Sequence, residues 1–186
     1  AATADEDLEA YVDNTEGTKV YSTGEFGEID LGKEATDEIF QSVGSIFYRE
    51  CTDCAESHQL IFYKRITEIY NWSVYDNMVN TWSSADNELN TDFELYSSYE
   101  DLVAGSNKWT YCSFDDNGIA FPRDCGPTVG VSNQWNSKTN ENTRDNVAYY
   151  ILGALASSFN PYEPSDEPSG VVIYSKGEYG DSDLGA

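Results

Sequence analysis

The two ends of the chain carry the same short sequence. Residues 20–32 read VYSTGEFGEIDLG and residues 173–185 read IYSKGEYGDSDLG, an offset of 153 residues. Eight of the thirteen positions are identical, three more are conservative, and Gly17 and Gly170 fall in the same register. Because this period is far longer than that of solenoid repeats, each unit is expected to fold by itself. Two alternatives stay open: the second copy is a strand that completes a neighbouring subunit, or both copies are paired strands of one duplicated sandwich.

A proline-rich acidic stretch separates the second copy from the rest of the chain. Residues 160–170 read NPYEPSDEPSG and contain three of the five prolines. Since proline fixes φ and favours extended backbone, this stretch is predicted to be a semi-rigid linker. The predicted organisation is an N-terminal acidic segment at 1–16, a repeat unit at 17–160, a linker at 161–170 and the start of a second unit at 171–186.

An excess of acidic residues restricts the partners that the chain can bind. There are 34 Asp and Glu residues against 10 Lys and Arg residues, which gives a formal net charge of −24. Such a field repels phosphate backbones and anionic lipids, and no apolar run is long enough to span a bilayer. We therefore expect no nucleic-acid binding and no membrane insertion. The charge attracts divalent cations and basic partners, although the simplest interpretation is solubility, including in a salty medium that screens it.

The hydrophobic pattern predicts mostly β-structure around a core that 39% hydrophobic residues can fill. Runs rich in β-branched and aromatic residues predict strands at 19–21, 44–48, 59–66, 91–96, 109–114 and 171–174. Helices are predicted at 36–42, at 98–105 with Ser98 as the cap, and at 145–159, whose tyrosines would also suit a strand. The predicted fold class is all-β: an antiparallel β-sandwich of jelly-roll type with one or two short helices.

Four cysteines, Cys51, Cys54, Cys112 and Cys125, predict two disulfides in an oxidising compartment. Three pairings exist, and the local one, Cys51–Cys54 with Cys112–Cys125, is favoured. The Cys-Thr-Asp-Cys spacing at 51–54 also fits a zinc site completed by His58 and a later cysteine, or a redox pair. A catalytic redox pair would need a thioredoxin-like βαβ context, which this strand pattern does not offer.

Two acidic stretches offer oxygen ligands for calcium, which binds about six to eight of them. The candidate ligands are Asp86, Glu88, Asn90 and Asp92 in the first stretch, and Asp115 and Asp116 in the second. The glycine that an EF-hand loop needs is missing from the first stretch, where Thr91 stands. Both stretches also suit solvated turns. Calcium is the one candidate cofactor.

Aromatic residues beside amides indicate a carbohydrate-binding surface as an alternative role. Aromatic faces stack on the apolar faces of sugars, and Asn and Gln side chains bind hydroxyl groups. The segment around Trp135 supplies this mixture with Asn133 and Gln134. The four tryptophans equally suit the core of a small sandwich. Asn71 opens the one Asn-X-Ser triplet that matches the N-glycosylation pattern, and such triplets also occur by chance.

Residues 28–31, Glu-Ile-Asp-Leu, resemble the start of the paired-carboxylate strand motif of jelly-roll glycoside hydrolases of the laminarinase type. The resemblance implies a nucleophile and an acid that share one face of a strand, with Glu28, Asp30 and Glu34 as the carboxylates concerned. In that family the acid follows the nucleophile by about four or five positions, where this chain has glycine and lysine. This departure disfavours a hydrolase, and the chain is expected not to be an enzyme.

These features together predict a structural or adhesive repeat unit of a secreted extracellular filament, wall or surface protein. Its expected partners are copies of itself or neighbouring repeats, which add many weak contacts through multivalency. The alternative role is a carbohydrate-binding module, with or without calcium, whose partner is an extracellular polysaccharide.

Overall fold

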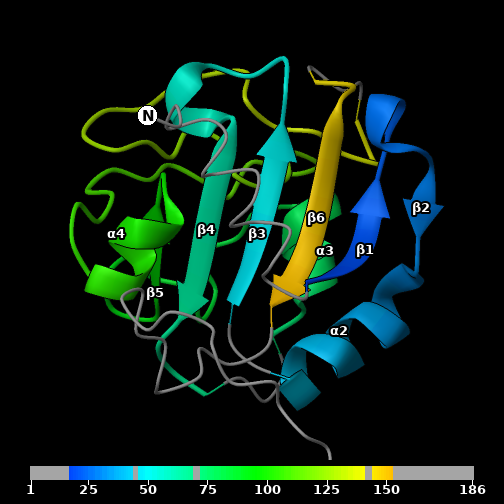
Figure 1. The fold of residues 1–186 in the computed structure, drawn as a ribbon, viewed down its shortest axis with the longest axis horizontal. Coiled ribbons are helices and arrows are strands. Elements are labelled where there is room, and N and C mark those ends of the chain that lie inside the picture. The colour runs from blue at the N-terminus through cyan, green and yellow to red at the C-terminus, as the bar shows by residue number, and fades with distance from the viewer. Residues whose placement is uncertain (1–16, 44–45, 69–71, 141–143, 153–186) are drawn as a thin grey trace, which may run out of the picture. The chain divides into compact units, whose positions relative to one another are not determined.

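The computed structural model describes residues 17–43, 46–68, 72–140 and 144–152 (Figure 1). They form one open antiparallel sheet in the order β2-β1-β6-β3-β4-β5. The strands are β1 Thr18–Ser22, β2 Ile29–Asp30, β3 Ile46–Cys51, β4 Leu60–Arg65, β5 Phe93–Tyr96 and β6 Val147–Leu152. The prediction of antiparallel β-structure is confirmed, but the sandwich is not, because these residues contain a single sheet. The predicted segments 1–16, 161–170 and 171–186 lie outside the described residues.

Short helices connect the strands. They are α2 Gly32–Val43, α3 Val74–Val79, α4 Tyr99–Ala104 and the 3-10 turns η1 Gly24–Phe26 and η2 Glu56–His58. The prediction for α4 is confirmed in detail: the Ser98 side chain accepts the Asp101 amide, and Gly105 ends the helix with a φ of 64°. Helix α2 is longer than predicted, and α3 was not predicted. No helix in the described part of the chain is long and apolar enough to cross a membrane.

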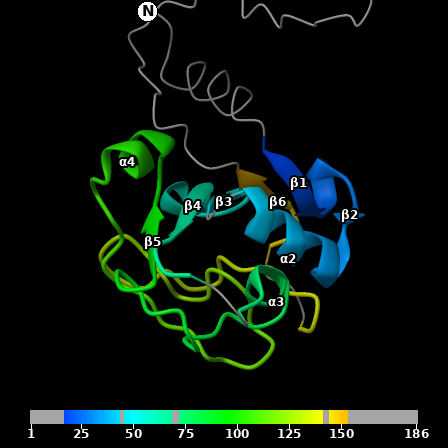
Figure 2. The same ribbon diagram turned by 90° about the horizontal axis from the view of Figure 1, so that it is seen from below.

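Helices and long loops cover one face of the sheet, where a second sheet would lie in a sandwich. Figure 2 shows α2, α3 and the segment between α4 and β6 on this face, with α4 on the opposite face. Their aromatic side chains fill the main core. The Phe47 ring stacks on Tyr63 with 4.5 Å between centroids, and Phe121 meets Phe47 edge-on at 5.3 Å. Irregular chain rather than strands therefore completes the core.

The predicted helix at 145–159 is wrong over its described residues, because Val147–Leu152 form strand β6, as the alternative of a strand allowed. This strand pairs with both β1 and β3, so it lies inside the sheet. Val147, Tyr149 and Ile151 point into the main core, and Leu152 faces the smaller core under α4. A strand buried on both faces gives a continuous apolar run, which has no clear period to separate it from a helix.

The predicted strand at 109–114 is also wrong. In its place the chain runs as a loop with one isolated β-bridge, between Tyr111 and Gly126. Single backbone hydrogen bonds, such as that from the Trp109 amide to the Leu95 oxygen at 2.9 Å, join this loop to its neighbours. Trp109, which suggested the strand, is fully buried as a loop residue, and its indole nitrogen donates to the Ser97 hydroxyl at 2.8 Å. Large aromatic residues bury equally well from loops when a sheet leaves one face open.

Candidate functional site

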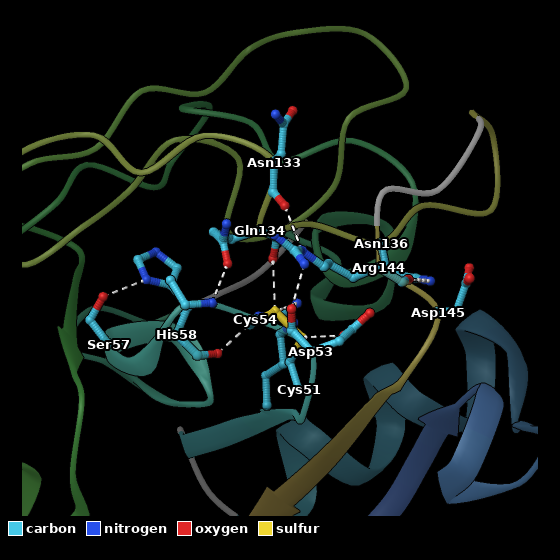
Figure 3. The surroundings of a disulfide bond; sticks show 12 residues. Cys51, Asp53, Cys54, Ser57, His58, Asn133, Gln134, Asn136, Arg144 and Asp145 are labelled. Carbon is cyan, nitrogen blue, oxygen red and sulfur yellow. Dashed lines mark hydrogen bonds between the residues drawn. A yellow bond between two sulfur atoms is a disulfide. The ribbon is translucent and has the colours of Figure 1, made fainter.

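The two disulfides have the predicted local pairing, Cys51–Cys54 and Cys112–Cys125. Cys51 is the last residue of β3, and Cys54 lies in the turn that leads to η2. Figure 3 shows Asp53, Gln134 and Arg144 gathered around this first disulfide. Both of its cysteines are buried, Cys54 at 8% exposure and Cys51 at 1%.

Opposite charges lie at the two sulfurs of Cys51–Cys54. The Arg49 guanidinium places Nη2 3.2 Å from the sulfur of Cys54. A carboxylate oxygen of Asp53 lies 3.2 Å from the sulfur of Cys51. Because a disulfide sulfur carries no hydrogen, this second contact joins a carboxylate to a sulfur and is not a hydrogen bond. The disulfide thus has a cation at one end and an anion at the other.

Arg49 is a buried cation without a carboxylate partner. Its side chain is fully buried, and no Asp or Glu among the described residues forms an ion pair with it. The guanidinium donates to the His58 main-chain oxygen at 3.4 Å, and its Nε has no partner in the described part of the structure. Burial lowers the pKa of Arg49, and the Tyr149 hydroxyl beside it and the negative charge of Asp53 oppose this shift. Such a cation is costly to bury unless an anion compensates it.

A polar frame fixes the turn that carries the disulfide. The Gln134 side chain accepts the Ala55 amide at 2.7 Å, and Arg144 donates to the main-chain oxygens of Asp53 and Asn133. These bonds tie residues 53–55 to the segment before β6 (Figure 3). The position of Asp53 beside the sulfur is therefore set by its own backbone.

The second disulfide has neutral surroundings. The indole nitrogen of Trp82 lies 3.2 Å from the sulfur of Cys125 and 3.5 Å from that of Cys112. Trp82 itself is fully buried, with its ring against Phe121 and Phe93. No charged side chain in the described part of the chain is recorded against either sulfur. This bond anchors a loop to the core.

Zinc does not fit the cysteines that the sequence suggested. Within the described ranges, the one group of acidic, histidine or cysteine ligand atoms within 4.8 Å of one another is Cys51, Asp53 and Cys54. Its two sulfurs are joined to each other, so they offer no thiolate. His58 is occupied elsewhere: Nε2 lies 2.9 Å from the Cys125 main-chain oxygen and Nδ1 2.9 Å from the Ser57 hydroxyl. Burial lowers the pKa of His58 to about 4, so it stays neutral.

The candidate calcium ligands organise loops. Asp92 accepts the Glu88 amide at 2.9 Å and the Thr67 hydroxyl at 3.0 Å, and Asp115 accepts the Ser84 amide at 2.7 Å. The remaining candidates are Glu88, which is exposed, Asp86 and Asn90, both with positive φ, and Asp116, which pairs with Arg123. None of the six belongs to a metal-ligand group of the kind found at Cys51 within the described chain. Calcium binding stays a prediction.

The proposed carbohydrate-binding residues are mostly buried. Trp135 is 7% exposed and Gln134 is 5% exposed, while Asn133 lies at the surface with a φ of 61°. The other three tryptophans are buried as well, so no indole ring offers an open stacking face. Asn71 lies outside the described residues. A carbohydrate-binding role thus gains no support from the tryptophans.

The carboxylates of the hydrolase resemblance serve the β1–β2 corner. Glu28 accepts the Gly24 amide at 3.2 Å, and Asp30 accepts the Tyr75 hydroxyl at 2.9 Å and also the Lys138 ammonium. Burial would raise the pKa of Asp30, but the hydrogen bonds from Lys138 and Tyr75 outweigh it and hold this pKa below its usual value. Glu34 is exposed in the first turn of α2. Glu28 thus stabilises the turn between β1 and β2, and Asp30 joins β2 to α3 and to the loop that carries Lys138.

Sequence reasoning missed Arg49, although a signal was present. Phe47, Arg49 and Cys51 alternate along β3, so they share the inward face of the strand. A charged residue at an inward position between two buried ones marks a special contact.

Comparison with family models, with curated proteins and with solved structures finds no match for the chain.

Proposed function

We propose that the chain is a structural or adhesive unit of a secreted tandem-repeat protein. The observation that carries this proposal is the pairing of β1 with β6, from Thr18 with Ile151 to Ser22 with Ala148. The first and last strands of the described fold are neighbours, so one fold closes within one 153-residue period. The two disulfides and the lack of a membrane-spanning helix among the described residues are compatible with secretion.

The repeated sequence coincides with the β1–β2 corner, and the retained residues are those that shape it. The Ser22 hydroxyl donates to the Gly27 oxygen at 2.6 Å, and the Tyr21 hydroxyl donates to Asn136 at 3.3 Å. Asp30 fastens β2 to Tyr75. The second copy has the same residue at all of these corner positions: Tyr174, Ser175, Gly180 and Asp183.

Gly24 shows that one position of the β1–β2 corner accepts only glycine. Its φ is 63°, and a Cβ atom there would lie 2.3 Å from the Asn146 side chain and 2.6 Å from the Asp145 main-chain oxygen. Any other L-residue would therefore be strained and would also clash. The second copy keeps glycine at this position, Gly177.

Five positions differ between the copies, and two of them, Glu28 and Ile29, are exposed. Ile29 is 36% exposed, and its counterpart is Ser182. Glu28 is exposed, and its counterpart is Asp181. The buried Val20 and the half-buried Phe26 keep an apolar counterpart, Ile173 and Tyr179. At Thr23 a specific contact would change, since its hydroxyl donates to the Asp145 oxygen at 2.6 Å and its counterpart is Lys176. This pattern supports a second copy that opens another unit with the same corner.

A two-unit chain tests the proposal. Residues 1–186 followed by residues 34–170 complete a second unit, because Ala186 stands one period after Lys33. Calorimetry of this chain is expected to give about twice the unfolding enthalpy of the 186-residue chain, since each unit folds as a cooperative domain. An enthalpy equal to that of one unit would contradict the proposal.

Matched substitutions sharpen this test. Gly177→Ala is expected to destabilise only the second unit of the two-unit chain by about 1–3 kcal/mol, and Gly24→Ala only the first, because both strain a positive φ. Ile29→Ser is the control, with an effect within about 0.5 kcal/mol at an exposed site. If the 186-residue chain assembles beyond its 20.7 kDa monomer and Gly177→Ala restores the monomer, the second copy completes a neighbouring subunit instead.

A further inference from the structure

We propose that Cys51–Cys54 is a reversible thiol–disulfide exchange site, with Arg49 and Asp53 as the residues that position and polarise its reduced form. The site would exchange electrons with dithiol compounds or dithiol proteins. This inference is independent of the repeat architecture, because every residue concerned lies within one described unit.

The cation beside Cys54 favours the reduced state. In the disulfide, the sulfur of Cys54 is neutral, and the fully buried Arg49 has no carboxylate partner among the described residues. After reduction, a thiolate at Cys54 would lie 3.2 Å from Nη2 and become a direct counterion, closer than the Asp53 carboxylate, whose charge acts on Arg49 from beyond ion-pair distance. Charge-assisted hydrogen bonds are stronger than neutral ones, so this pairing stabilises the reduced form more than the oxidised form.

The anion beside Cys51 acts in the same direction by a different route. The Asp53 carboxylate lies 3.2 Å from a sulfur that carries no hydrogen in the disulfide. Reduction gives Cys51 a proton, and its thiol can then donate to that carboxylate. The Asp53 carboxylate also lies within 4.8 Å of the sulfur of Cys54, so the direct contact that each sulfur makes separates their roles. Arg49 holds Cys54 as the thiolate, and Asp53 holds Cys51 as the thiol.

The exchange balances with a dithiol as the reductant. The bond between the sulfurs of Cys51 and Cys54 breaks, and a sulfur–sulfur bond forms within the dithiol, which passes two electrons to the protein. The dithiol loses two protons. Cys51 takes one of them, and the other goes to solvent because Cys54 remains a thiolate.

The second disulfide is an internal control. The sulfurs of Cys112–Cys125 contact the neutral Trp82 nitrogen, so no cation is placed to stabilise a thiolate there. Cys112 is, however, only half-buried, whereas Cys51 and Cys54 are buried. Exposure by itself would therefore make Cys112–Cys125 the easier bond to reduce, and the charges predict the opposite order.

Redox equilibration of the full chain tests the inference. The protein is equilibrated in mixtures of reduced and oxidised dithiothreitol at pH 7, quenched with acid, alkylated, and mapped by peptide mass spectrometry. Cys51–Cys54 is expected to reach half reduction at a ratio of reduced to oxidised reagent at least about tenfold lower than Cys112–Cys125, or about 30 mV for this two-electron couple. Equal ratios, or the opposite order, would overturn the proposal.

Variants of Arg49 and Asp53 test the effect of each charge on the reduction of Cys51–Cys54. Arg49→Met is expected to lower the equilibrium constant for reduction of Cys51–Cys54 by about tenfold or more and to leave Cys112–Cys125 unchanged. Asp53→Asn, at an exposed position, is expected to raise the alkylation rate of reduced Cys51 several-fold, because the repelling charge is gone. An unchanged constant in a folded Arg49→Met protein would refute the role of the guanidinium.

The wild-type protein provides a measurement that does not depend on a folded Arg49 variant. In the reduced chain, Cys54 is expected to react with iodoacetamide well below the pH of about 8.5 at which an ordinary thiol ionises, and Cys51 only near or above it. Alkylation of both cysteines with the same midpoint near 8.5 would refute the polarised site.

Discussion

Cys51–Cys54 closes a loop over a sequence separation of 3, between a buried cation and an exposed anion. Cys112–Cys125 closes a loop over a separation of 13, against a neutral indole in the main core. Spacing and composition predicted both bonds equally well. Their surroundings differ in charge, and charge determines which form of a cysteine pair is stabilised. Two disulfides of one domain can therefore differ in role, one structural and the other placed for reversible reduction.

His58 touches both regions. Its ring lies 2.9 Å from the Cys125 main-chain oxygen and packs on Trp109 with 4.8 Å between centroids. Its own main-chain oxygen accepts Arg49 at 3.4 Å. The backbone and ring of one buried residue therefore join the structural disulfide to the charged one.

The largest expected effect comes from removing each bond in turn. Replacing Cys112 and Cys125 by alanine is expected to lower the free energy of unfolding by about 3 kcal/mol, and replacing Cys51 and Cys54 by about 2 kcal/mol, because the longer loop restricts the unfolded chain more. Urea unfolding of the two double variants measures the difference. A larger loss for the Cys51 and Cys54 variant would show that the short loop carries the structural role.

A second effect follows from the buried His58. Its pKa is about 4 in the fold against 6.5 in the unfolded chain, so between these values only the unfolded chain takes up a proton. The contribution of neutral His58 to the free energy of unfolding is fully present above pH 6.5 and is lost as the pH falls towards 4. The loss is about 2 kcal/mol at pH 5. Urea unfolding from pH 7 to pH 5 measures this loss. Burial also raises the pKa of Glu50, so the part that belongs to His58 is the difference from a His58 variant.

His58→Gln is the matched variant for that measurement, because its amide can still donate to the Cys125 oxygen. Its free energy of unfolding is expected to fall less than that of the wild-type protein between pH 7 and pH 5, whatever its absolute value. An equally steep fall in the variant would assign the acid sensitivity to groups other than His58.

The smallest expected effect is that of Asp53→Asn on the oxidised protein. Asp53 is exposed, and its main-chain oxygen keeps the bond to Arg144. The free energy of unfolding is therefore expected to change by less than about 0.5 kcal/mol. Thermal unfolding of the oxidised variant checks this. A loss of more than about 1 kcal/mol would mean that the carboxylate supports the fold and not only the reduced cysteine.

Local signals were interpreted correctly where they act over a few residues. The Ser98 cap and Gly105 define α4, and both disulfides join cysteines that are close in sequence. Sequence patterns whose meaning depends on which other segments pack against them gave wrong predictions. β6 resembled a helix because both of its faces are buried, and residues 109–114 resembled a strand because their aromatic side chains fill the core from a loop.

The sequence by itself determined the excess of negative charge, most strands of a β-rich core, the favoured cysteine pairs and the repeated residues at 20–32 and 173–185, because composition, alternation and spacing are local properties of a chain. Only the tertiary structure decided that β1 pairs with β6, and that Arg49 reaches the sulfur of Cys54 while Asp53 lies beside Cys51. Strand order depends on which side chains bury together across the whole domain. The chemistry of a sulfur depends on which charges that burial brings within a few ångströms of it.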